Sequence, residues 1–546
     1  MKTRRIALVM AGGVSLGSYE AGVLTELLYA LETLNASAGA GDPRYELDVM
    51  TGGSAGGMTG AIVGRMMFEM PARRDALFNA WVRDIDIVPL LNGGDIPKNA
   101  LLSKRIIGEI AERSLVSAAP AGPASPASYA PQTLRLSLSI SNMNGVTYRI
   151  PYANAAGGAT SFMTTFFADM ARFTVDRDRP QDTDWRQVRD ACISSGNFPI
   201  AFRPQRMVRD PDDYPGAQEA EDPASSLFEQ GMTFVDGGLF NNEPLGEAIR
   251  RAAEADRDGE DVERLFILID PFINTSKHNA EFSPDDELIK VVMRLVTMIR
   301  GESTARDWLR AERINDQLRW RREFVEELKT LVAAVPDAEA PGMARHTAAM
   351  TREIVASQRD LEDQEGPPDL RTRLPRDESF TAARAQLSGE DRRDVFDRLV
   401  FALDEVAGLS SKSMIELKAI DADETELAGE TLQGFGGFFE REWREHDFRV
   451  GRRKAHGLLP GILGRDYDRE KDAAGQLVRD YELPPDWREF KHKTLADTGR
   501  GPRKQVRDIM LDRSVDLLKD VGIKNPVYRW GARMVLKRVL NGVLSL

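Results

Sequence analysis

Hydrophobic and polar residues follow two different patterns along the chain, and the change falls near its middle. In the first half, the apolar runs at residues 6–10 and 265–269 have the length of buried β-strands. Residues 134–140 alternate between apolar and polar side chains, which predicts a strand buried on one face. Apolar side chains within residues 23–31 recur at helical spacing. Strands alternating with helices predict an α/β domain over residues 1–275, with a mostly parallel central sheet.

The second half, residues 276–546, has few strand-like runs and long charged segments with helical periodicity. These segments cover residues 288–331 and 382–406. Stretches rich in proline and acidic residues, at 335–341 and 363–375, interrupt the helical pattern. We expect a mainly helical C-terminal region whose role the pattern does not indicate.

Length and composition narrow the class of protein. A chain of 546 residues with 42% hydrophobic residues is large enough for two or three domains. The net charge of −13 argues against a general nucleic-acid-binding protein. The single cysteine, Cys192, excludes an intrachain disulfide and makes a cysteine-based metal site unexpected, which suits the reducing cytoplasm.

Neither a spanning helix nor a signal peptide is expected from the apolar runs. No run approaches the roughly 20 residues that a spanning helix needs. The N-terminal run at residues 6–10 is shorter than the apolar core of a signal peptide, which takes about 7–15 residues. We therefore expect a first buried strand there, and a soluble or peripheral protein.

Residues 52–57, Gly-Gly-Ser-Ala-Gly-Gly, place one serine among four glycines directly after a mostly apolar stretch. Within them, Gly52-Gly53-Ser54-Ala55-Gly56 fits G-x-S-x-G, the tight strand-to-helix turn that exposes a nucleophilic serine. Glycines two positions before and after the serine allow the close backbone approach that such a turn requires. The alternative is an ordinary glycine-rich turn.

A glycine-rich loop also follows the first predicted strand, at residues 11–19. Its backbone N–H groups can stabilise the negative charge of a tetrahedral intermediate. A phosphate-binding P-loop is disfavoured because Ser18 and Tyr19, with no lysine, follow Gly17. A dinucleotide-binding turn is disfavoured because the glycines have the wrong spacing.

A third segment places a carboxylate at a predicted strand end. Asp236 follows the run Phe234-Val235 and precedes Gly237 and Gly238. A carboxylate in this place can accept the proton of a serine as a general base. Taken alone, the Asp-Gly-Gly sequence is also compatible with a simple turn.

Taken together, these segments resemble the patatin-like phospholipase family. The resemblance covers about residues 3–275 and includes a fourth segment, residues 191–204, that looks like a family segment with the pattern Pro-x-x-Phe-x-Pro. The other matching residues are Gly12-Gly13, Gly17, Tyr19-Glu20-Ala21-Gly22-Val23-Leu24, Gly52 to Gly56, Asp236-Gly237-Gly238, Asn242 and Pro244. Four segments in the family's order are much more specific than any one of them.

The resemblance implies a three-layer α/β/α fold and a Ser–Asp dyad that hydrolyses acyl esters of lipids without a metal or other cofactor. It makes Ser54 the nucleophile, Asp236 the base, and the backbone of Gly12, Gly13 and Val14 the oxyanion hole. The chain departs from the family pattern twice. Leu16 stands where the family usually has a basic residue, and Val14 replaces a glycine.

The histidines test this dyad against a Ser–His mechanism. All five follow Asp236 in the chain, and His278 is the candidate that lies near a predicted strand end. The serine turn comes early for an α/β-hydrolase, and no His-Gly oxyanion motif precedes it. We therefore expect His278 to be a surface residue.

The C-terminal segment has a basic stripe on a predicted helix. Arg529, Arg533 and Lys537 recur every four residues, and apolar side chains occupy another side. Such a helix is typical of contact with an anionic membrane. Trp530 and Leu540 interrupt the polar face, which favours a helix docked on the protein itself, and both interpretations stay open.

The sequence therefore predicts a serine lipid acyl hydrolase of phospholipase A or lysophospholipase type. Its expected partners are a phospholipid or other lipid ester and, through the basic helix, a membrane surface, with no nucleic acid. The alternative from another class is a catalytically silent protein of the same fold that binds or regulates through its helical half.

Overall fold

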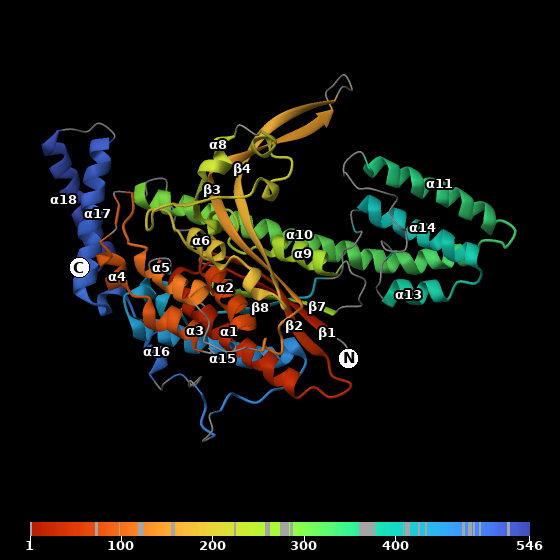
Figure 1. Ribbon diagram of the computed structural model, residues 1–546, viewed down its shortest axis with the longest axis horizontal. Helices are drawn as coiled ribbons and strands as arrows, with labels where there is room; N and C mark the ends of the chain where they lie inside the picture. The colour runs from red at the N-terminus through yellow and green to blue at the C-terminus, as the bar shows by residue number, and fades with distance from the viewer. Residues whose placement is uncertain are drawn as a thin grey trace. The chain divides into compact units, whose positions relative to one another are not determined.

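The computed structural model covers the whole chain (Figure 1). It describes residues 3–546 except 71–74, 95, 98, 118–124, 154–158, 223–224, 257–262, 273–282, 284–287, 360–373, 375–377, 408, 410–414, 424–425, 432–433, 472–474, 479–482, 484–485, 491–492 and 521–524.

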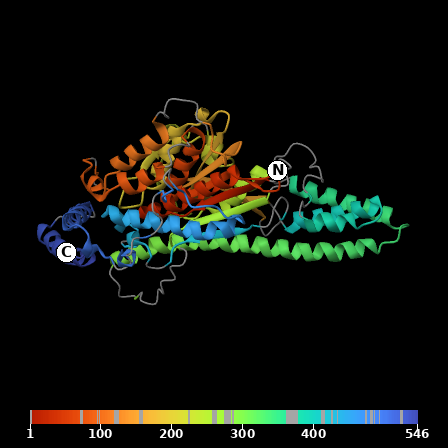
Figure 2. The same cartoon turned by 90° about the horizontal axis from the view of Figure 1, so that it is seen from below.

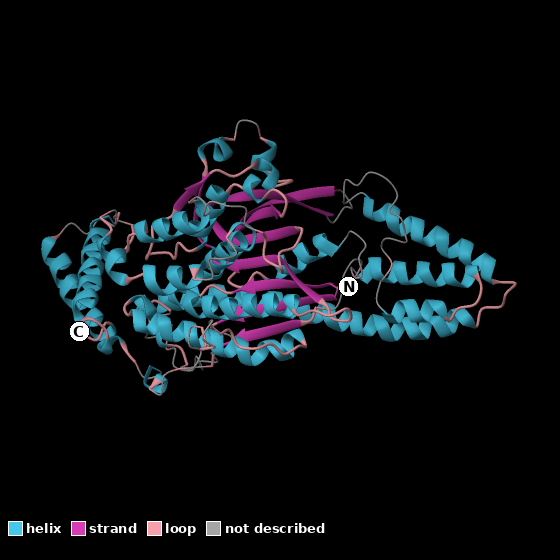
Figure 3. Cartoon of the chain, turned by 60° about the horizontal axis from the view of Figure 1, so that its bottom comes forward, coloured by secondary structure: helices cyan, strands magenta, loops and turns pink. Residues whose placement is uncertain are grey.

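A single eight-stranded sheet forms the centre of the fold within the described residues. Its strands are β1 Thr3–Met10, β2 Arg44–Gly53, β3 Thr133–Ala153, β4 Ala159–Asp176, β5 Gln205–Met207, β6 Met232–Asp236, β7 Glu263–Asp270 and β8 Leu417–Asp421. They lie in the order β5-β6-β3-β2-β1-β7-β8, and β4 pairs with β3. Figure 3 shows the strands side by side in magenta, with helices around them. The predicted strands at residues 6–10, 134–140 and 265–269 are all present.

The expected α/β fold is confirmed, with a mixed central sheet in place of a mostly parallel one. Strand β2 pairs in parallel with β1 and β3, and β8 pairs in parallel with β7. Strand β3 is 21 residues long and extends past the end of β2. There it pairs antiparallel with β6, while β4 runs back along its whole length (Figure 1). The spacing of apolar residues did not indicate the antiparallel pairing of β3 with β4 and with β6.

Helices cover both faces of the sheet. Leu134 and Leu138 of β3 lie against the glycines of α2, on one face. The hydroxyl of Ser137, which points to the opposite face, donates to Glu247 of α9 at 3.0 Å. The strand expected to be buried on one face is therefore buried on both, because a second helical layer covers its serines.

The helices around the sheet are α1 Gly17–Ala36, α2 Ser54–Glu69, α3 Ala76–Phe78, α4 Ile87–Asn92, α5 Arg105–Ala111, α6 Trp185–Ser195, α7 Gln218–Glu221, α8 Ser226–Gln230 and α9 Leu245–Ala255. The later helices are α10 Leu288–Ala333, α11 Ala340–Arg359, α13 Glu378–Ala385, α14 Glu390–Ala407, α15 Arg441–Leu463, α16 Trp487–Phe490, α17 Arg500–Asp520 and α18 Pro526–Val543. Short 3-10 or π turns are η1 Val14–Leu16, η2 Asn79–Asp84, η3 Glu112–Val116, η4 Pro180–Asp182, η5 Pro211–Asp213, η6 Gly237–Leu239, η9 Ala428–Glu430, η10 Gly436–Phe438 and η11 Leu495–Asp497.

The helical prediction for the second half is confirmed in outline. Helix α10 includes the predicted segment 288–331, and a turn at the predicted break 335–341 joins it to α11. The segment 382–406 is split between α13 and α14. Apart from Leu374, the break at 363–375 lies outside the described residues.

By its internal contacts the chain divides into two compact units. The first comprises Met1–Ala248, Leu265–Thr304 and Leu417–Leu546, and the second comprises Ile249–Arg264 and Ala305–Glu416. The first unit therefore includes β8 and α15 from the second half of the chain. The division at residues 275 and 276 stays a prediction, since compactness does not test which segments fold on their own.

Helix α15 packs along α1 in the first unit (Figure 2). Gly22 of α1 lies so close to the Phe448 carbonyl that an added Cβ would stand 2.0 Å from its oxygen. A fully buried ion pair, Glu26 with Arg452 at 2.9 Å, joins the same two helices. Among the described residues, no helix is long and apolar enough to cross a membrane.

Candidate active site

Ser54 and Asp236 meet at the carboxyl end of the sheet. Ser54 is the first residue of α2, directly after β2, and Asp236 is the last residue of β6. The Ser54 hydroxyl donates to Oδ2 of Asp236 at 2.9 Å. Both residues are buried, with 4% and 2% of their surface exposed. The arrangement is a hydroxyl already hydrogen-bonded to a carboxylate, which is the geometry that serine activation requires.

The turn around Ser54 is tight because glycines permit it. Ser54 itself has φ of +48°, a left-handed conformation that residues other than glycine seldom adopt. A Cβ on Gly52 would stand 2.6 Å from the backbone of Gly56, and one on Gly56 would stand 2.6 Å from the Met10 carbonyl oxygen. The spacing of these two glycines therefore follows from the close approach of β1, β2 and the start of α2.

Backbone groups hold the carboxylate of Asp236 in place. The Gly238 N–H donates to its Oδ1 at 2.7 Å, so one oxygen is fixed while the other faces Ser54. A Cβ on Gly237 would stand 1.9 Å from the Ser139 carbonyl oxygen, so only glycine fits there. The hydroxyl of Ser141 on β3 donates to the Asp236 carbonyl at 2.7 Å. Asp236 is thus anchored on the neighbouring strand.

The glycine-rich loop after β1 lies beside the serine. Its Gly12 N–H donates to the Asn242 carbonyl at 3.2 Å, so this predicted oxyanion donor is already occupied. Within the described residues, the N–H groups of Gly13 and Val14 have no hydrogen-bond partner. Val14 has φ of +56°, and Gly17 packs so closely that a Cβ would stand 2.5 Å from the Trp81 ring. Two of the three N–H groups predicted as donors therefore have no partner among the described residues.

Sequence reasoning gave no role to two residues that support the site. The Ser195 hydroxyl accepts the Ser54 N–H at 2.8 Å, and the Asn197 carbonyl accepts the Asp236 N–H at 3.0 Å. Both lie in the segment 191–204, which the sequence marks as a motif without indicating what its polar side chains contact. They connect Ser54 and Asp236 to the end of α6 and the residues after it.

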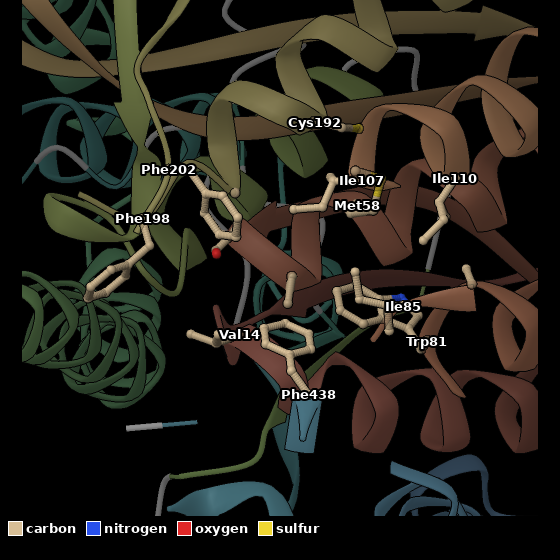
Figure 4. Close-up of a pocket in the computed structure, with 14 residues that line it drawn as sticks. Val14, Met58, Trp81, Ile85, Ile107, Ile110, Cys192, Phe198, Phe202 and Phe438 are labelled. Atoms are coloured by element: carbon tan, nitrogen blue, oxygen red, sulfur yellow. The ribbon is translucent and has the colours of Figure 1, made fainter. Parts of the chain in front are cut away.

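An apolar pocket opens beside Ser54 (Figure 4). The empty space within it is about 660 Å³, a volume that includes open solvent at its mouth. Its lining residues are Val14, Ser54, Ala55, Met58, Ala80, Trp81, Ile85, Ile107, Ile110, Cys192, Gly196, Phe198, Phe202 and Phe438. Burial raises the pKa of the Cys192 thiol far above its usual value, so the thiol stays protonated and unreactive. A largely apolar wall with the Ser54 hydroxyl among its few polar groups suits the binding of a hydrocarbon chain.

Residues 8–249 match the family model of patatin-like phospholipases. Over these residues the chain is therefore similar to the patatin-like phospholipase family, whose description names lipid hydrolysis. The resemblance expected from the four motifs is confirmed.

A curated relative matches the chain over a longer stretch. An uncharacterized protein, y4iI, of Sinorhizobium fredii (strain NBRC 101917 / NGR234) is 26% identical over 385 residues. The match covers 55% of this chain and 54% of the relative. The chain thus spans about half the length of the curated relative that it matches.

The two departures from the patatin-like pattern have local explanations. Leu16 is fully buried, and its Cδ2 lies against Gly429 from the C-terminal half, so a charged side chain there would lose its hydration. Val14 keeps its backbone N–H and adds an apolar side chain to the pocket wall. His278 lies outside the described residues.

A second buried carboxyl group lies behind the glycine-rich loop of the patatin-like domain. Glu20, in the first turn of α1, is fully buried, and its Oε1 would stand 3.1 Å from a Cβ on Gly13. Burial raises the pKa of Glu20 well above its usual value, and the charge of Asp270 raises it further. Burial and the nearby charge of Asp270 therefore both disfavour the ionised form of Glu20 beside Gly13.

Proposed function

We propose that this chain is a serine hydrolase of lipid acyl esters, of phospholipase A or lysophospholipase type. The observation that carries the proposal is the 2.9 Å hydrogen bond from the Ser54 hydroxyl to Asp236. The match of residues 8–249 to a family of lipid acyl hydrolases supports the same class of substrate.

In the proposed first step, Ser54 Oγ attacks the carbonyl carbon of the ester while its proton passes to Asp236 Oδ2. The negative charge that develops on the carbonyl oxygen is stabilised by the N–H groups of Gly13 and Val14. Collapse of this intermediate breaks the ester bond, and the leaving alcohol takes the proton from Asp236. The acyl group is then attached to Ser54.

In the second step, water attacks the acyl-enzyme and gives its proton to Asp236. Collapse of the second tetrahedral intermediate releases a fatty acid and returns the proton to Ser54. Throughout, the acyl chain occupies the apolar pocket beside Ser54, where burial of each methylene group contributes about 0.8 kcal/mol of binding free energy. The pocket thus supplies affinity, and the dyad supplies the chemistry.

The experiment that tests this proposal is labelling with a fluorophosphonate probe, followed by mapping of the modified residue. We expect one modified position, Ser54, and no labelling of the Ser54→Ala variant. Ser194→Ala is the matched control, because it removes a buried hydroxyl that donates to the Asp190 carbonyl at 2.8 Å instead of contacting Ser54. Labelling that survives Ser54→Ala, or its absence from the natively folded chain, would contradict the proposal.

We also propose that α18 contacts the lipid surface that presents the substrate. Its exposed apolar side chains include Trp530 and Val535, with 65% and 68% of their surface exposed. Arg529 and Lys537 add positive charge along the same helix, and Arg533 is paired with Asp512 of α17. Apolar side chains beside basic ones are typical of helices that lie in the headgroup region.

A further inference from the structure

The glycine-rich loop of the site is covered by a segment from far along the chain. We define residues 428–431 and 434–438 as the cover segment. The Ser15 N–H donates to the Gly434 carbonyl at 3.0 Å, and the Ser15 hydroxyl donates to the same oxygen. The Gly437 N–H donates to the Ser15 hydroxyl at 3.1 Å. Ser15 directly follows Val14, so these bonds fix the loop next to the two free N–H donors.

The backbone of the cover segment lies in direct contact with the glycine-rich loop. Gly434 has φ of +89°, and a Cβ on it would stand 2.8 Å from the Gly13 carbonyl oxygen. A Cβ on Gly437 would stand 2.5 Å from the Ser15 hydroxyl. Glycines at these two positions therefore follow from direct backbone contact with the loop.

The same segment forms one wall of the apolar pocket. Phe438 lines the pocket together with Ser54 and Val14, and Figure 4 shows Phe438 beside Val14. The ring of Phe435 lies 6.0 Å from that of Phe438 and 5.5 Å from that of Phe198 on the other side, with edge-to-face geometry. Phe435 thus joins the cover segment to the wall made by residues of the matched domain.

Helix α15 holds the cover segment at both ends. Asp447 accepts the N–H groups of Ala428 and Gly429 at 2.7 and 2.9 Å. The Arg444 guanidinium donates to the carbonyls of Gly437 and Phe438 at 2.8 and 3.1 Å. Both side chains are buried, so these bonds are shielded from water.

We propose that the cover segment is a functional part of the site that binds and hydrolyses the acyl ester. Phe438 limits the length of the acyl chain that the pocket accepts, and Gly437 is a positioning residue that holds the oxyanion donors through Ser15. This inference rests on the proposed hydrolase function and gives the C-terminal half, which lies outside the matched domain, a role in substrate selection.

The first test measures the chain-length dependence of fatty acid binding. Saturated fatty acids of 8 to 16 carbons are titrated against the Ser54→Ala chain, with and without Phe438→Ala. Loss of the ring leaves room for further methylene groups, each worth about 0.8 kcal/mol, or about fourfold in affinity. We therefore expect the affinity ratio of the 14-carbon to the 8-carbon acid to rise at least about tenfold.

Two variants distinguish this effect from a loss of folding. Phe438→Leu, which keeps part of the wall, should give an intermediate ratio. Phe439→Ala removes the next buried phenylalanine, which does not line the pocket, and should leave the ratio unchanged. An unchanged ratio in natively folded Phe438→Ala would overturn the selection role. Because hydrolysis is not measured, this result is separate from a failure of Ser54 labelling.

The second test addresses the positioning role with Gly437→Ala. The added methyl group pushes on the Ser15 hydroxyl and displaces the loop, so kcat for a soluble short-chain ester should fall at least about tenfold while KM changes little. Gly457→Ala is the matched control, since its Cβ meets nothing within 4 Å, and kcat should stay unchanged. Lower stability of Gly437→Ala with an unchanged kcat would show a structural role only.

Discussion

At the residue scale, the site depends on backbone conformations that most side chains would prevent. Ser54 and Val14 both have positive φ angles, each at a cost of about 1–3 kcal/mol. Close backbone contacts hold both residues in these conformations. Strand β1 lies against Gly56, and Gly434 lies against the Gly13 carbonyl. Strain of this kind, at the proposed nucleophile and at a proposed oxyanion donor, restricts both residues to one geometry.

Asp236→Asn tests the base. An asparagine can still accept the Gly238 N–H through its oxygen, so the position is kept, but its amide nitrogen cannot take the Ser54 proton. We expect ester turnover to fall at least about a hundredfold, the lower end of what a positioned base contributes. The measurement is kcat with a soluble ester, and circular dichroism monitors folding.

His278→Ala is the comparison for the base. It should leave turnover within a few-fold of the original, because the proposed mechanism uses no histidine. Tolerance at Asp236 combined with loss of turnover in His278→Ala would point to a Ser–His mechanism instead.

At the element scale, α1 and α15 cross where two glycines let their backbones meet. A Cβ on Gly22 would stand 2.0 Å from the Phe448 carbonyl oxygen, and one on Gly451 would stand 2.2 Å from the Tyr19 carbonyl oxygen. Reciprocal contacts of this kind bring the helices closer than side chains allow. The start of α1 carries the glycine-rich loop, so the crossing also sets where that loop lies.

Gly22→Ala should therefore destabilise the first unit. Overpacking against a backbone carbonyl costs about 1–3 kcal/mol, since neither helix can move without disturbing the sheet. Gly457→Ala, in open space on α15, should leave the free energy of unfolding unchanged or raise it by up to about 1 kcal/mol through helix propensity. Urea denaturation of both variants measures the difference, and equal effects would show that the crossing is not tight.

Helix α18 is docked at its end and exposed at its start. Leu540 and Leu544 are buried, and the Arg503 guanidinium donates to the Leu544 carbonyl at 3.0 Å. Trp530 and Val535 point to solvent. The docked interpretation therefore describes the last turn, which packs on the protein. The first turns are exposed and can make the proposed membrane contact.

The double variant Trp530→Ser with Val535→Ser tests that contact without removing the docked turn. We expect its affinity for vesicles containing anionic phospholipid to fall at least about tenfold, while hydrolysis of a soluble ester is unchanged. Val406→Ser is the control, because it removes an apolar side chain of α14 that is 78% exposed. Unchanged vesicle affinity of the double variant would refute the membrane contact of α18.

At the scale of the whole molecule, buried charges connect segments that are far apart in the chain. Glu26 of α1 contacts Arg452 at 2.9 Å, His456 at 3.0 Å and the Tyr467 hydroxyl at 3.1 Å. Breaking a buried pair by removing one partner typically costs about 3–5 kcal/mol, because the other charge stays buried. This cluster therefore fixes α15, and with it Asp447 and Arg444, relative to the glycine-rich loop.

Asp447 makes stability depend on pH. Burial raises the pKa of Asp447 to about 7, although its bonds from Ala428 and Gly429 act in the opposite direction. Between its unfolded value near 4 and about 7, the folded chain holds a proton that the unfolded chain has lost. The contribution of Asp447 to stability is therefore fully present below about pH 4 and is lost as pH rises through about 7.

Comparison with Asp447→Asn isolates this contribution. The original chain should lose stability relative to the variant as pH rises from 5 to 7, by at most about 1.4 kcal/mol per pH unit, with no further relative change above about pH 8. The free energy of unfolding of both proteins across this range provides the measurement. A parallel pH dependence of the two proteins would show that Asp447 is ionised throughout.

The sequence by itself determined the features that are set within a few residues. The serine turn, the Asp-Gly-Gly turn and the strand at residues 6–10 all have their own signature, because a tight turn or a buried strand needs particular residues at that place. The order of these segments was enough to indicate the family. The length of α10 also followed from its uninterrupted helical pattern.

Tertiary structure alone decided what covers these segments. An apolar face shows that something packs on it, but not which element does so. Contacts between residues more than 400 positions apart, such as Ser15 with Gly437, leave no periodic signal in either segment. The same reason explains the buried serines of β3, the pairing of β8 with β7, and the occupied N–H of Gly12, since each depends on a partner that only the folded chain brings near.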